Sequence, residues 1–276
     1  MLAEAVDLTI GKYVLKSSGN YRYSMVLLGV GILPMMAYVA AAGAGNMSIL
    51  DVALSAAAGV ISAGAIIIYY RSLELQQETN VAALTEVQPA LLFLFGVFVL
   101  GETINSIEIA GILAIFIGAA FVMTTRKMRL NMLLVPVIIA NALWAVQWVV
   151  FDYVIGSYGG YVLPILIGRI ISFAFVSAYV LGFRKVDPNV SRYRNMAPAY
   201  LILGLMALVG ILDGSANILF AIVVKSNIIA IGSVIYATMP IVAALLARIF
   251  YRDGLSNIQK AGLVIAVLGA IAIGIG

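Results

Sequence analysis

The sequence contains no cysteine and no histidine, and it carries few charged residues for a chain of 276 residues. Without thiols the protein has neither disulfides nor a cysteine nucleophile, and without imidazoles it has no histidine-based acid–base catalysis. The usual ligand sets for zinc are excluded for the same reason. We therefore predict no catalytic residues, no metal site and no cofactor.

Charged residues make up 10% of the chain, whereas a soluble domain has about 25%. Apolar residues make up 64%, and the mean hydropathy is +1.12. So few charges cannot cover a water-exposed surface, so lipid is the expected solvent for most of it. The net charge of +4 does not indicate a nucleic-acid partner, because the basic residues are scattered through short loops without a basic face.

The chain divides into ten apolar stretches separated by short polar breaks, and a helix needs about 20 such residues to cross a bilayer. The first stretch is the weakest because it contains Glu4, Asp7 and Lys12. It is either a short helix that faces an interior cavity or a helix that is truncated at its start. We predict membrane spans at residues 1–16, 23–42, 49–71, 79–100, 107–125, 132–156, 161–183, 198–224, 228–250 and 258–276.

The sequence repeats itself at an offset of 151 residues. In this register the matched pairs are Pro89 with Pro240, Glu102 with Asp253, Gly111 with Gly262, and Gly118 with Gly269. The pattern fits one five-span unit used twice, over residues 1–128 and 129–276. An odd number of spans inverts the second unit, and inverted repeats are typical of transporters with a substrate site near the midplane.

The repeated motifs resemble those of a known family. They are Thr85-Glu86-Val87-Gln88-Pro89, then Leu100-Gly101-Glu102-Thr103-Ile104, then a helix with Gly111 and Gly118; the second copy has Tyr251-Arg252-Asp253 in place of Leu-Gly-Glu. In this order they resemble the EamA repeat of the drug/metabolite transporter superfamily, over nearly the whole chain. Trp144 resembles the tryptophan of the family's first-helix motif, and Glu4 replaces it in the first copy.

The resemblance implies an all-α integral membrane protein with ten transmembrane helices, arranged as two inverted five-helix repeats around a central cavity. It also implies export or exchange of amino acids, metabolites, nucleotide-linked sugars or drugs. The sidedness stays open. Basic residues outside the spans lie at odd-numbered connections except Lys225, so the positive-inside rule places both termini outside, whereas the resemblance implies cytoplasmic termini.

Polar residues within the spans are the candidate site, since ionisable groups are costly in lipid. Asp213 and Asn217 lie one helical turn apart, and Glu86 and Gln88 precede Pro89. The counterpart of Asp213 is Ser62, so the polar lining is not duplicated and suits an asymmetric solute. The predicted substrate-binding or coupling residues are Asp213, Asn217, Glu86, Gln88, Trp144, Trp148, Tyr236 and Asp7.

Each candidate has a structural alternative. The acids either contact substrate or exchange a proton, or else a buried acid is tied to Arg169 and only fixes helix packing. Trp144 and Trp148 line a cavity or belong to the core. Pro89 and Pro240 are either gating kinks or packing kinks.

The function we predict is secondary transport of a small organic solute by alternating access, in a multi-pass protein of the plasma or inner membrane. No Gly-x-x-x-x-Gly-Lys loop is present for ATP, so coupling to protons or to a counter-solute is expected instead. The alternative is an intramembrane enzyme or a lipid-handling membrane protein. The sequence has no paired-acid motif within a single span, and such a motif would be needed to support the enzyme alternative.

Overall fold

The computed structural model describes residues 20–75, 87–123, 135–183, 199–225 and 256–275, together with 232, 234 and 238. These residues form eight α-helices and no strand, which confirms the predicted helical class for this part of the chain. The helices are α2 (Asn20–Ala42), α3 (Ile49–Leu75), α5 (Val87–Phe98), α6 (Ser106–Met123), α7 (Val135–Tyr158), α8 (Val162–Phe183), α10 (Ala199–Lys225) and α13 (Asn257–Ile275).

Each of the eight helices coincides with one predicted span. The ends agree within a few residues except at the start of α5, where residues 76–86 lie outside the described part. The first predicted span and nearly all of the ninth also lie outside it, so a total of ten helices stays a prediction.

Five of the helices are long and apolar enough to cross a membrane: α2, α3, α7, α8 and α10. The apolar stretches of α5, α6 and α13 are shorter. Large apolar side chains such as Leu33, Phe175 and Leu219 are exposed on the outside of the bundle. An apolar outer surface of this extent suits contact with lipid rather than water.

Helices α6 and α13 begin with the same device in both copies of the repeat. Asn105 caps α6 by accepting from the Glu108 amide at 2.9 Å, and Glu108 accepts from the Asn105 amide at 2.7 Å. Ser256 and Gln259 exchange the equivalent bonds at 3.3 and 2.9 Å at the start of α13. Such capping boxes satisfy amides that lack intrahelical partners. Asn105 and Ser256 are 151 positions apart, as are Glu108 and Gln259, so the repeat includes the capping boxes of the two helices.

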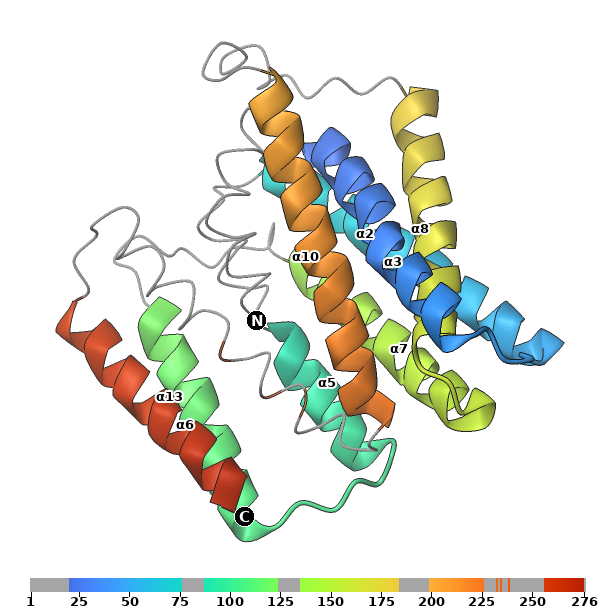
Figure 1. Cartoon of the computed structure of the whole chain (residues 1–276). Coiled ribbons are helices and arrows are strands. Elements are labelled where there is room, and N and C mark those ends of the chain that lie inside the picture. The colour runs from blue at the N-terminus through green and yellow to red at the C-terminus, as the bar shows by residue number, and fades with distance from the viewer. Residues whose placement is uncertain are drawn as a thin grey trace.

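The two helices pack side by side at one edge of the molecule (Figure 1). Gly118 faces the backbone of Gly262, and Gly269 faces the backbone of Gly111. Because residue numbers rise along one helix as they fall along the other, the pair is antiparallel. Gly118 and Gly269 are equivalent positions of the repeat, and so are Gly111 and Gly262. The two contacts are therefore equivalent, as expected when a local twofold axis relates α6 to α13.

The remaining long helices pair across the two halves of the chain. Helix α10 packs along α2, and α3 packs along α8, so each pair joins one first-half helix to one second-half helix. Gly59 of α3 lies against Gly168 of α8, and Gly210, 151 residues after Gly59, lies against Val30 of α2. Small residues at these crossings let the helix backbones approach closely.

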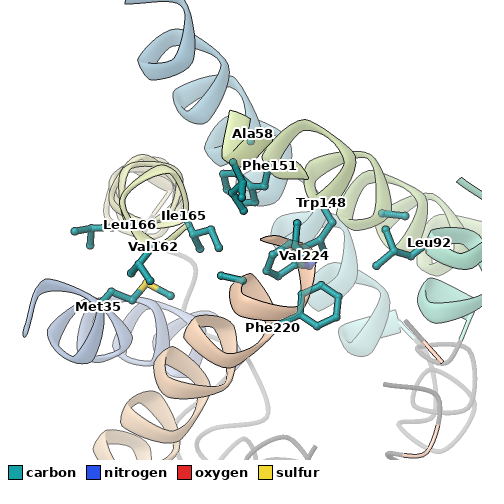
Figure 2. Packing of buried hydrophobic residues seen from close by; sticks show 13 residues of the cluster. Met35, Ala58, Leu92, Trp148, Phe151, Val162, Ile165, Leu166, Phe220 and Val224 are labelled. Atoms are coloured by element: carbon teal, nitrogen blue, oxygen red, sulfur yellow. The ribbon is translucent and has the colours of Figure 1, made fainter. Parts of the chain in front are cut away.

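The largest buried cluster lies where α7 and α10 meet the other helices. The Trp148 ring of α7 packs edge-on against Phe220 of α10, with ring centroids 4.4 Å apart, and against Phe151 at 5.7 Å. Met35 of α2, Leu92 of α5 and Leu166 of α8 also belong to the cluster, as Figure 2 shows. This core fixes α7 and α10 against helices from both halves of the chain.

Candidate functional site

The principal polar contact inside the described spans joins α8 to α10. The Arg169 guanidinium donates through Nη2 to a carboxylate oxygen of Asp213 and forms an ion pair. The Arg169 side chain is 7% exposed and that of Asp213 is 20% exposed. Arg169 therefore points inward rather than toward a membrane surface, and the pair matches the geometry of the packing alternative for Asp213.

The same guanidinium also reaches the first half of the chain. Its Nε donates to the Leu28 carbonyl at 3.1 Å, and Nη2 donates to the Leu27 carbonyl at 3.0 Å. Both carbonyls belong to α2. A single side chain thus connects α2 of the first half to α8 and α10 of the second, at the depth of the ion pair.

Gly31 provides the space that Arg169 occupies. A β-carbon at position 31 would overlap the guanidinium, so only glycine is compatible with this placement of the Arg169 side chain. Gly214, directly after Asp213, lies against the Gly31 carbonyl and the ring of Pro34. The close approach of α2 and α10 therefore depends on two glycines that flank the ion pair.

Asn217 supports Asp213 rather than standing apart from it. The Asn217 side-chain amide donates to the Asp213 backbone carbonyl at 2.8 Å and lies 3.4 Å from a carboxylate oxygen of the same residue. The one-turn spacing predicted that the two residues share a helix face, and the structure brings them into contact. Asn217 therefore lies near Oδ1 of Asp213, whereas Arg169 binds Oδ2.

The region that corresponds to Asp213 in the first repeat is apolar. Ser62, the counterpart of Asp213, is buried in α3, and its neighbour Ala63 belongs to a cluster with Leu28, Ile66 and Val176. Within the described residues, this ion pair therefore belongs to one half only.

The two tryptophans have different surroundings. Trp148 is buried in the large core cluster, whereas Trp144 is partly buried, with its ring centroid 5.4 Å from that of Tyr69 on α3. Trp148 is thus part of the apolar core, and Trp144 packs beside α3.

The other predicted residues lie near or beyond the described limits. Gln88 and the buried Pro89 are in the first described turn of α5. The remaining candidates, Glu86, Tyr236, Pro240 and Asp7, lie outside the described residues. The gating role of the two prolines therefore stays a prediction.

Comparison with known proteins identifies the family. The EamA-like transporter family matches residues 1–124 and, a second time, residues 131–275. The chain belongs to the EamA-like transporter family. This confirms the resemblance drawn from the Gln88-Pro89 and Leu100-Gly101-Glu102 motifs and from their second copies.

Membership makes this EamA-like protein an integral membrane protein and a transporter of small solutes, and members of the family are transporters rather than enzymes. No curated protein matches the chain. A solved structure titled "Crystal structure of protein" has a TM-score of 0.76 over 99% of this chain and 94% of its own, at 17% identity. At that identity the likeness concerns the fold alone, and it extends over the whole EamA-like chain.

Proposed function

We propose that this EamA-like protein is a secondary carrier that exports or exchanges a small organic solute across the plasma or inner membrane, with the Arg169–Asp213 pair at its substrate or coupling site. The observation that carries the proposal is the position of the pair. Asp213 and Arg169 are second-half residues, and Arg169 also holds the α2 carbonyls of the first half. A ligand at this point contacts both halves.

An ion pair in a low-dielectric interior can be intact, or it can be separated when another charge replaces one partner. Removing either charge from its partner is costly unless another charge takes its place. A solute with an ammonium group can replace Arg169 at Asp213, and a solute with a carboxylate can replace Asp213 at Arg169. Protonation of the Asp213 carboxylate releases Arg169 in the same way. Each route ties occupancy of the site to the contact between halves.

The duplicated scaffold supports movement by alternating access. Corresponding helices α6 and α13 are in antiparallel contact, as expected for a repeat whose second copy is inverted. We propose residues 1–128 and 129–276 as the two repeat units, with the solute between them. Because the helices of the two units pack in pairs, such as α2 with α10 and α3 with α8, movement of these pairs relative to one another exposes the Arg169–Asp213 site to one side of the membrane at a time.

Solute counterflow in proteoliposomes tests the proposal. Candidate solutes come from a thermal-shift screen of amino acids, nucleotide sugars and amphiphilic cations, each added to the purified protein. For a screened solute loaded inside the vesicles, we expect saturable uptake of the labelled form with transient accumulation above equilibrium, as exchange by one carrier site requires. Flux that rises linearly with concentration, or solute recovered in chemically altered form, would contradict a carrier.

A further inference from the structure

The helices that hold the ion pair are joined a second time at one end of the bundle. Helix α2 ends at Ala42, α10 ends at Lys225, and α8 begins at Val162. These ends lie together at one face of the molecule, because Tyr161 contacts both Tyr38 and Lys225. Tyr161, directly before α8, is eight residues from Arg169, which is about 12 Å along a helix. Lys225 is twelve residues from Asp213, or about 18 Å. The second junction therefore lies about 12–18 Å from the ion pair toward one end of the bundle, a distance close to half of a hydrocarbon core about 30 Å thick.

Tyr161 is the centre of this junction. Its hydroxyl is hydrogen-bonded to the hydroxyl of Tyr38 on α2, and the two rings are tilted with centroids 5.6 Å apart. The ammonium group of Lys225 lies over the Tyr161 ring, 5.0 Å from its centroid. A cation over an aromatic face is attracted by the negative charge of the ring's π face. Tyr161 thus contacts the first half through Tyr38 and the end of α10 through Lys225.

A second contact between the halves lies at the same ends of neighbouring helices. The Ser157 hydroxyl, in the last turn of α7, donates to a carboxylate oxygen of Asp51 at 2.7 Å. Asp51 lies in the first turn of α3, where its other oxygen accepts from the Ser48 hydroxyl at 2.7 Å. Both α2 and α3 are therefore tied to second-half helices at this face, through single polar contacts that exchange for water at small cost.

We propose that Tyr38, Tyr161 and Lys225 form a gate that closes this face, and that the gate opens when the Arg169–Asp213 site communicates with water on that side. The inference rests on the proposed carrier function. Tyr38 and Tyr161 are partly buried and pack against the large core cluster, so they lie between that cluster and the ends of α2 and α10. The hydroxyl bond is a polar contact that water can replace when the helix ends separate, as a contact that forms once in each transport cycle requires.

Cysteine substitution tests the gate, because the chain has no native cysteine that would react. In Tyr38→Cys/Tyr161→Cys, a short bifunctional thiol reagent with a reducible link is expected to lower counterflow about tenfold, and dithiothreitol is expected to restore it. The single variants Tyr38→Cys and Tyr161→Cys, treated with the same reagent, are the matched controls and keep their untreated rates. Recovery under dithiothreitol also shows that the crosslinked protein is folded.

A labelling measurement tests the gate independently of transport. Ala221 is fully buried on α10, one turn before Lys225, and Ala221→Cys is the reporter. Adding Tyr161→Phe, which keeps the ring but removes the hydroxyl, together with Lys225→Gln, is expected to speed reaction of this cysteine with a membrane-impermeant maleimide severalfold. Faster labelling without counterflow would support the gate while removing the carrier function. Full counterflow in crosslinked protein, or unchanged labelling, would overturn the gate.

Discussion

Asp213→Asn and Arg169→Gln are each expected to lower solute counterflow about tenfold or more and to lower the free energy of unfolding. Each variant leaves one charge of the buried pair without its partner. Removal of one partner from a buried pair costs about 3–5 kcal/mol, whereas replacement of both by neutral groups of similar size is often neutral. Purified variants compared by thermal unfolding and by counterflow give both quantities.

The double variant Arg169→Gln/Asp213→Asn separates the two roles of the pair. If the pair has a role in transport, the double variant regains thermal stability but still lacks counterflow. Recovery of both quantities would show that the pair only fixes helix packing and would remove it from the proposed site. The comparison works because packing depends on a matched pair, while substrate or proton binding depends on the charges themselves.

Two glycine-to-alanine variants test the placement of Arg169 without removing either charge. Gly31→Ala keeps both charges but places a β-carbon in the space of the Arg169 guanidinium, so it is expected to act in the same direction as Asp213→Asn. Gly64→Ala adds the same methyl group within α3, where no atom lies within 4 Å of it, and is expected to leave transport unchanged. Equal behaviour of the two variants would contradict the described placement of Arg169.

Gly118→Ala and Gly269→Ala are expected to destabilise the protein to a similar extent. A β-carbon at Gly118 would lie 2.6 Å from the Gly262 carbonyl oxygen, and one at Gly269 would lie 2.5 Å from that of Gly111. These neighbours are backbone atoms, so α6 and α13 must move apart to admit the methyl group. Overpacking of this kind costs about 1–3 kcal/mol.

Reversible unfolding in mixed micelles measures the effect of these substitutions. Gly64→Ala is again the matched control and is expected to be neutral or stabilising by up to about 1 kcal/mol, because alanine favours the helix more than glycine does. If only one of Gly118→Ala and Gly269→Ala lowered the free energy of unfolding, or if neither lowered it more than the control, the symmetric antiparallel contact would be contradicted.

Much of the helical layout could be predicted from the sequence. Apolar runs of bilayer length located the eight described helices, because lipid requires each span to satisfy its own backbone hydrogen bonds. The repeat followed from prolines, acids and glycines in one register. The residues before α5, the first predicted span and nearly all of the ninth lie outside the described residues, so those predictions stay untested.

The candidate site was less accessible to sequence reasoning. The Asp213–Asn217 contact followed from helical spacing, and Arg169 was named as a structural partner for the acid. Gly31 was missed, since a glycine in an apolar span gives no sign of what lies beside it. Tyr38 and Tyr161 are 123 residues apart, and only the packing of α2 against α8 brings them together. The sequence did offer one indication. An arginine inside a membrane span needs space for its guanidinium, and a glycine on a neighbouring helix, such as Gly31, can provide that space.

The central claim is that two oppositely oriented halves form one carrier, and the caps of α6 and α13 test it most directly. Asn105 and Ser256 are equivalent positions of the repeat, 151 residues apart, and both are exposed. Single variants Asn105→Cys and Ser256→Cys in intact cells or sealed vesicles are treated with a membrane-impermeant maleimide. The inverted arrangement predicts that one position is labelled from outside and the other only after the membrane is permeabilised. Labelling of both positions from the same side would contradict it.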